Sequence, residues 1–116
     1  MSEAINLDDT AQSLHATALE KGFWDPLKRM KYEDHFIFYA KQLMMIDSEV
    51  TEVLEALRKK KGSKAVVEEL SDILIRVLDL YAGMLNRGVI TESLHDVFLE
   101  KADFNKTRDR LHGVAG

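Results

Sequence analysis

The sequence contains no cysteine, a single proline and no long apolar run, and each absence narrows what the chain can be. Without cysteine there are no disulfides, thiolate zinc sites or cysteine nucleophiles, and such a composition is usual in a reducing compartment. We therefore expect a cytoplasmic protein. No apolar stretch approaches the roughly 20 residues of a membrane-spanning helix, and the N-terminal segment 1–9 carries three acids and no base. Neither secretion nor a membrane anchor is expected.

Acidic residues also outnumber basic ones, 20 to 16, so the formal net charge is −4. Binding to nucleic acid requires a basic surface that neutralises the phosphates. A nucleic acid polymer is therefore not an expected partner.

The shortage of proline and glycine predicts a chain built of helices, since apolar residues recur every three or four positions with little to interrupt them. The 116 residues suffice for a single domain with one core, over 1–116, in which about 112–116 is a loose tail. Helices are predicted to end at Gly22 and at Gly62. Asp25 and Pro26 are predicted to form a turn. Four helices are predicted: one over about 7–21, one over about 33–61, one from the N-cap Ser63 to near Gly88, and one after the N-cap Thr91.

Each predicted helix carries an apolar stripe that must meet another stripe, which indicates an all-α, four-helix bundle or an interlocked helical dimer. Several stripes are broad, so we expect a homo-oligomer, either a dimer or a tetramer, to complete the bundle. The residues expected to point inward from the two central helices are Phe36, Leu43, Val50, Val53, Leu54, Leu57, Leu70, Ile73, Leu74, Val77 and Tyr81.

The two central helices each carry a pair of acids three residues apart, within apolar surroundings. Glu49 and Glu52 form the first pair, Glu69 and Asp72 the second, and this spacing places both members of a pair on one helix face. Four carboxylates that face one another repel, so they need a cation to remain ionised. Oxygen ligands favour a hard ion, and Mg²⁺ leaves positions for water and substrate phosphates. A single pair of this kind is more typical of a solvated helix face. Two pairs on consecutive helices predict a Mg²⁺ site for phosphoryl chemistry.

Other polar residues extend these faces. Glu55 lies one i+3 step beyond Glu52 and would serve a second metal ion. Asp79 lies seven residues after Asp72 and would support the site from further away. Arg76 would form an ion pair with Asp72 or reach a phosphate, and we favour the ion pair.

Residues 48–56 and 68–75 are similar to the ExxE and ExxD halves of the MazG-like, all-α nucleoside triphosphate pyrophosphohydrolases. Residues 20–25 resemble the end of the first helix in the phage and bacterial branch of this family. Residues 101–108, followed by His112 and Gly113, resemble the C-terminal signature of that branch. Two positions depart from the pattern, since Ala102 replaces a larger apolar residue and Asp109 stands where many relatives have proline.

The resemblance implies Mg²⁺-dependent cleavage of a (d)NTP to the nucleoside monophosphate and pyrophosphate, with Mn²⁺ as a substitute ion. Nucleotide-pool house-cleaning is a role that suits such an activity. It also implies that the four acids are the metal ligands, and that Lys101, Asn105 and Arg108 bind the substrate's phosphates and sugar. We choose Glu52 as the carboxylate that orients the attacking water.

Two aromatic residues, Phe23 and Trp24, follow the first predicted helix and are candidates to stack on a base. Core packing is the alternative for both rings. The sequence leaves open which base and which sugar the chain would accept.

Two other classes of function remain open. One is a non-catalytic helical interaction module whose acids are only solvated. The other is a metal-carboxylate bundle that stores metal or performs redox chemistry, although no helix Glu-x-x-His motif that faces a second one, as in di-iron bundles, is expected from the sequence.

Overall fold

The computed structural model describes residues 4–108, and this part of the chain is helical, without a strand. The predicted all-α class is confirmed. No helix in the described range combines the length and the apolar character needed to cross a membrane. The elements are α1 (Leu7–Glu20), α2 (Asp25–Lys28), the 3-10 helix η1 (Tyr32–Asp34), α3 (His35–Arg58), α4 (Ser63–Asn86) and α5 (Leu94–Lys106).

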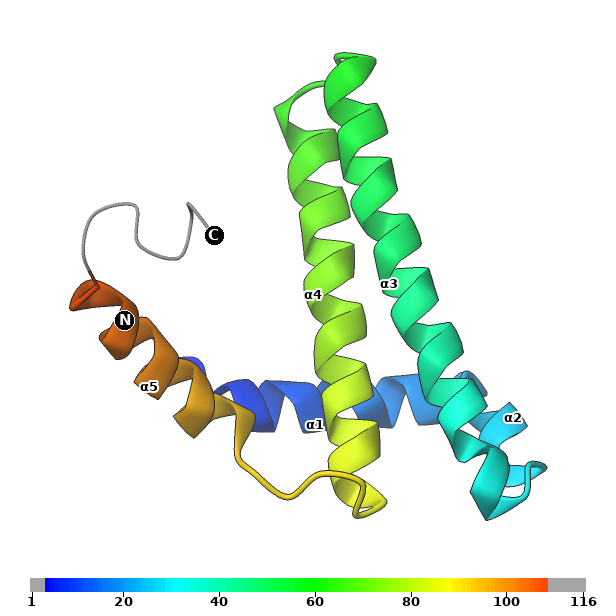
Figure 1. Ribbon diagram of the computed structural model, residues 1–116. Coiled ribbons are helices and arrows are strands. Elements are labelled where there is room, and N and C mark those ends of the chain that lie inside the picture. The colour runs from blue at the N-terminus through cyan, green and yellow to red at the C-terminus, as the bar shows by residue number, and fades with distance from the viewer. Residues whose placement is uncertain (1–3, 109–116) are drawn as a thin grey trace.

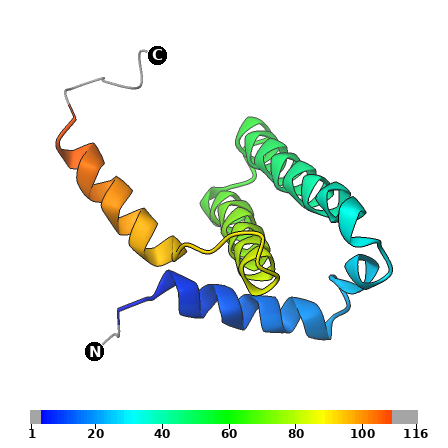
Figure 2. The same cartoon turned by 60° about the horizontal axis from the view of Figure 1, so that its bottom comes forward.

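Two long helices, α3 and α4, form an antiparallel hairpin, and α1 crosses the base of that hairpin (Figure 1). The link between α3 and α4 turns at Gly62, whose positive φ of 100° favours glycine. Helix α5 lies on the opposite side of α4 from α3 in both views (Figure 2). The single chain therefore presents a helical hairpin with one crossing helix and one lateral helix.

The helix ends follow local chemistry, with some differences from the predicted caps. Asn6 caps α1, where its side chain accepts from the N–H of Asp9. The predicted N-cap Ser63 is instead the first residue of α4, after Gly62. The predicted N-cap Thr91 is replaced by Ser93, whose hydroxyl accepts from the N–H of Asp96.

The expected turn at Asp25 and Pro26 is the first turn of the short helix α2. Proline fits there because its fixed φ suits a helix and the first turn has no use for its missing N–H. Gly22 ends α1 as predicted, with a φ of 83°. The chain thus reverses within a few residues and brings Trp24 back against α4.

Helix α5 is fastened to α1 through Asp8. The Asp8 carboxylate accepts from the backbone N–H of His95 at 2.9 Å and from the Ser93 hydroxyl. A second tie comes from α4, where the Tyr81 hydroxyl accepts from the N–H of Leu94 at 2.9 Å. These bonds hold the start of α5 against the rest of the chain.

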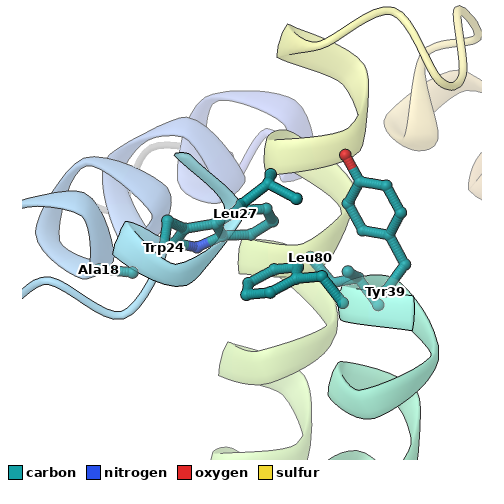
Figure 3. Close-up of a cluster of buried hydrophobic side chains, with 6 residues drawn as sticks. Ala18, Trp24, Leu27, Tyr39 and Leu80 are labelled. Atoms are coloured by element: carbon teal, nitrogen blue, oxygen red, sulfur yellow. The ribbon is translucent and has the colours of Figure 1, made fainter. Parts of the chain in front are cut away.

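The core lies where α1 and α2 meet the N-terminal half of α3 and the C-terminal half of α4. The Trp24 ring is at its centre (Figure 3). The Trp24 side chain is 2% exposed. Gly83 of α4 lies directly beneath this ring, because a Cβ atom added to Gly83 would come within 2.0 Å of the Trp24 Cη2 atom. The buried residues of this cluster are Ala18, Trp24, Leu27, Phe38, Tyr39 and Leu80.

Several residues predicted to point inward are exposed in the single chain. Leu54 is 52% exposed and Leu74 is 62% exposed, whereas Val53, Ile73 and Tyr81 are half-buried or buried as predicted. The exposed apolar residues recur at heptad spacing. We call Phe36, Leu43, Val50, Leu54 and Leu57 the α3 seam, and Val67, Leu70, Leu74 and Val77 the α4 seam.

Candidate functional site

Three of the four predicted acids converge where α3 and α4 run side by side. Helix α3 supplies Glu49, and α4 supplies Glu69 and Asp72. One carboxylate oxygen from each lies within 4.8 Å of the other two. Glu49 and Glu69 are half-buried, and Asp72 is exposed. Because both helices are regular and antiparallel here, their i, i+3 faces meet across the hairpin.

The fourth acid, Glu52, is exposed and lies outside this trio, but its charge acts on it. The pKa of Glu69 is raised above its ordinary value, first by partial burial and then by the negative charges of Glu52, Asp72 and Glu49. The Lys61 ammonium opposes this shift. The four carboxylates therefore interact as one electrostatic group, which we call the acid cluster.

Glu55, predicted to serve a second metal ion, lies among cations of its own helix. Its carboxylate is 3.3 Å from the Arg58 guanidinium and 3.8 Å from the Lys59 ammonium. Both are exposed ion pairs near the end of α3, where such pairs contribute little to stability.

Arg76 bridges the two helices instead of pairing within α4. Its Nε donates to Oε1 of Glu49 across the hairpin at 2.9 Å. Among the described residues it makes no ion pair with Asp72, so the favoured expectation for Arg76 was wrong. The reason is geometric: the guanidinium reaches a carboxylate on the adjoining helix, which a spacing rule within one helix does not consider.

A cavity of about 320 Å³ borders the acid cluster on the side of α1. Glu49, Asp72 and Phe23 are among the residues that line it. We call it the acid cavity. A second cavity of about 460 Å³, the side cavity, lies between α2, α3 and α4. The two share three lining residues, Phe23, Arg76 and Asp79, so they adjoin at these side chains.

Two polar residues of the side cavity, Lys41 and Gln42, were missed by the sequence reasoning. Gln42 lies seven residues before Glu49 on α3, and this separation is the signal that places it on the same helix face. Lys41 brings a cation into the side cavity, which Arg76 also lines. The combined cavity thus has acids in one wall, Arg76 beside them and Lys41 in the side cavity.

Trp24 is a core residue, and the expectation that its ring faces a base was wrong. The ring packs edge-on against His15 and near Phe38, and the Arg87 guanidinium lies 4.6 Å from its centre. Its Nε1 donates to both carboxylate oxygens of Asp79, at 3.0 and 3.1 Å. A large ring can be fully buried at this position because its one polar atom finds a partner there.

Asp79 and Phe23 have different surroundings from those of Trp24. His15, 1% exposed, places its Nδ1 atom 2.8 Å from the Asp79 carboxylate, so Asp79 ties α4 both to α1 and, through Trp24, to the link before α2. Phe23 is 66% exposed and lines both cavities. Phe23 therefore remains the aromatic candidate for contact with a base.

The predicted phosphate-binding residues Lys101, Asn105 and Arg108 lie on or just after α5 and are exposed. Helix α5 stands on the far side of α4 from α3 (Figures 1 and 2), and hydrogen bonds join its start to α1 and to the C-terminal half of α4. The structure does not bring these residues to the acid cluster within one chain. His112 and Asp109 lie outside the described residues.

Comparisons with protein-family models, curated proteins and solved structures found no match to this chain. The likeness to MazG-like enzymes rests on its motifs alone. It remains a prediction.

Proposed function

We propose that the chain hydrolyses a nucleoside triphosphate to the monophosphate and pyrophosphate in a Mg²⁺-dependent reaction, as a MazG-like enzyme would. The observation that carries this proposal is the convergence of carboxylates from two helices in the wall of a cavity that also holds basic side chains. Cavities of roughly 300–1,000 Å³ are the size that binds small ligands. Acids beside cations in such a space suit a metal-bound triphosphate.

The acid cluster fits a magnesium ion. Two oxygens that share one Mg²⁺ lie at most about 4.2 Å apart, twice its usual bond length of roughly 2.1 Å. The trio of Glu49, Glu69 and Asp72 already lies within 4.8 Å, so small side-chain rotations close the remaining gap. The raised pKa of Glu69 indicates unbalanced negative charge that a cation would relieve. Mn²⁺, which takes the same oxygen ligands, would substitute.

Each part of the site has a role in this reaction. A bound Mg²⁺ would neutralise triphosphate charge and favour ionisation of a coordinated water. Glu49, Glu69 and Asp72 would hold the ion, and Glu52 would orient the water toward the α-phosphorus. Lys41 attracts the phosphates from the side cavity, and the exposed Phe23 ring offers a face to the base.

We further propose that a second copy of the chain completes the bundle. The α3 seam and the α4 seam are each apolar at heptad spacing, which is typical of helices that pack against partners. In an assembly built on these seams, α5 of one copy supplies Lys101, Asn105 and Arg108 to the acid cluster of another. A dimer and a tetramer both satisfy this requirement.

The deciding experiment offers a panel of canonical and damaged (d)NTPs with Mg²⁺ and identifies the first products. Pyrophosphate and a monophosphate are expected, and a chelator should abolish their release. Asp72→Asn should lower the rate by roughly 10²–10³-fold or more, the effect of losing one group that stabilises transition-state charge. Glu68→Gln is the matched control, because Glu68 is exposed and adjoins Glu69 but is outside the trio.

Orthophosphate as the first product would refute pyrophosphohydrolysis. Absence of any response to Mg²⁺ or nucleotide would instead favour a helical interaction module, for which the two apolar seams are the supporting observation. Visible absorption after loading with iron would indicate a redox or storage bundle.

A further inference from the structure

Arg76 occupies the boundary between the two cavities and is bonded to a residue of the acid cluster. Its side chain lines both the acid cavity and the side cavity. The Glu49 side chain that it contacts is 14% exposed, so water screens this pair less than a surface pair. The guanidinium therefore occupies one carboxylate of the cluster.

The bond to Glu49 uses only part of the guanidinium. It is made through Nε, and the two Nη groups have no hydrogen-bond partner among residues 4–108. A guanidinium presents five N–H donors in a planar fork that matches phosphate oxygens. The free part of Arg76 is thus suited to an anion in the cavities it lines.

A divalent cation and Arg76 compete for the same carboxylate. When a cation is bound by the trio, Glu49 has less negative charge to share, and the cation itself repels the guanidinium. A triphosphate that arrives with the cation offers new anionic oxygens beside Arg76. Charge-assisted bidentate bonds to phosphate are among the stronger hydrogen bonds.

We propose that Arg76 exchanges partners during the catalytic cycle, holding Glu49 when the site is empty and contacting a substrate phosphate once a metal ion occupies Glu49. This inference rests on the proposed function and adds to it a phosphate-binding residue supplied by the same chain as the acids. In the empty site, the Arg76–Glu49 pair also removes part of the repulsion within the acid cluster.

The exchange predicts opposite effects on two binding constants. Arg76→Ala removes the competitor for Glu49, so Mn²⁺ alone should bind about three- to tenfold more tightly, as expected for loss of a partly buried opposing charge. Tripolyphosphate in the presence of Ca²⁺, a probe without base or sugar, should bind roughly 10–100-fold more weakly, because bonds to a charged group are lost. Titration calorimetry measures both constants.

The matched control is Arg58→Ala, which removes the same charge from α3, where Arg58 pairs with Glu55 away from the cavities. It should leave both constants within about twofold of the parent. Arg76→Lys keeps the charge but loses the fork, so it should retain the parent's Mn²⁺ affinity and bind tripolyphosphate several-fold more weakly. This variant decides the matter if Arg76→Ala does not fold, as judged by circular dichroism.

The exchange is overturned if Mn²⁺ binds Arg76→Ala no more tightly than Arg58→Ala and if both Arg76 variants bind tripolyphosphate as the parent does, in which case Arg76 only joins two helices. The exchange is also overturned if Arg76→Ala lowers the affinity for Mn²⁺ as well as the affinity for tripolyphosphate. Failure of the proposed function would look different, since the parent itself would then bind neither Mn²⁺ nor tripolyphosphate.

Discussion

Glu69 is held among like charges, and this has a consequence for stability without metal. Its pKa is raised in the folded state by partial burial and by Glu52, Asp72 and Glu49. A raised carboxyl pKa means that folding favours the protonated form of Glu69. Its contribution to stability is therefore fully present at a pH below its pKa in the unfolded chain, near 4.5, and is lost as pH rises through its pKa in the folded protein. At neutral pH the charge of Glu69 destabilises the apo protein.

We expect Glu69→Gln to melt at a higher temperature than the parent at pH 7 with chelator present, because it removes one repelling charge. The difference should shrink as pH falls below about 4.5, where Glu69 is protonated in both states. Millimolar Mg²⁺ should reverse the order, since ligand binding stabilises only the parent's intact site. Thermal melts across pH, with Glu68→Gln as control, measure this. A lower melting temperature for Glu69→Gln under chelator would mean that Glu69 is a structural partner.

The acids were predictable from the sequence because i, i+3 spacing fixes a helix face without knowledge of the neighbour. The partner of Arg76 was not, since it depends on how α3 and α4 are rotated about their own axes. Trp24 was misjudged because its burial depends on Asp79, 55 residues away in sequence, which accepts its N–H.

At the scale of elements, the position of α5 depends on a few polar bonds around Asp8. Burial pushes the pKa of Asp8 upward, but hydrogen bonds from the Ser93 hydroxyl and the His95 N–H outweigh it, and the net shift is downward. A carboxylate whose pKa is lowered by folding stabilises the folded protein at a pH above its pKa in the unfolded chain, 3.8 for Asp8. This stabilisation is lost as pH falls through its pKa in the folded protein. Acid should therefore loosen α5 from α1.

We expect Asp8→Ala to loosen α5 at neutral pH by about 1–3 kcal/mol, the range for hydrogen bonds to a charged group. Hydrogen exchange of the α5 amides should accelerate in this variant and in the parent below pH 3.8, while α3 changes less. Asp9→Ala is the matched control, because Asp9 shares the first turn of α1 but is exposed. Equal exchange in the two variants would show that Asp8 does not hold α5.

The bounds of the long helices were largely predictable, because apolar period and the glycine stops Gly22 and Gly62 act locally. The caps were predicted less well. Thr91 and Ser93 are both good N-cap residues, and the choice between them is made by Asp8 and Tyr81, which bind the backbone that follows Ser93.

For the whole molecule, the decisive feature is apolar surface that one chain leaves exposed. Periodicity identified the stripes on α3 and α4 but not what covers them, because a pattern defines a face and not its partner. Leu54 and Leu74 were predicted to point inward, yet both are more than half exposed in the single chain. Their heptad spacing favours burial against another copy.

We expect the parent to have a solution mass of two or four times 13.2 kDa, measured by light scattering after size exclusion. The double variant Leu54→Glu, Leu74→Glu should be a monomer, because burying two charges in an apolar contact is strongly unfavourable. It should also lose activity if α5 of one copy completes the site of another. Ile5→Glu is the control, since Ile5 is exposed outside both seams. A monomeric parent with full activity would contradict this assembly.

The contact between Trp24 and Gly83 also constrains how this sequence can evolve. Any side chain at position 83 would collide with the indole, since even a methyl carbon would come within 2.0 Å of it. A smaller residue in place of Trp24 would leave a hole in the core, at a cost of about 3–5 kcal/mol for loss of the whole ring. Each substitution is harmful alone, yet the second becomes acceptable after the first. The two positions should therefore covary among descendants of this chain. A descendant that replaces both residues one at a time must pass through a destabilised single variant.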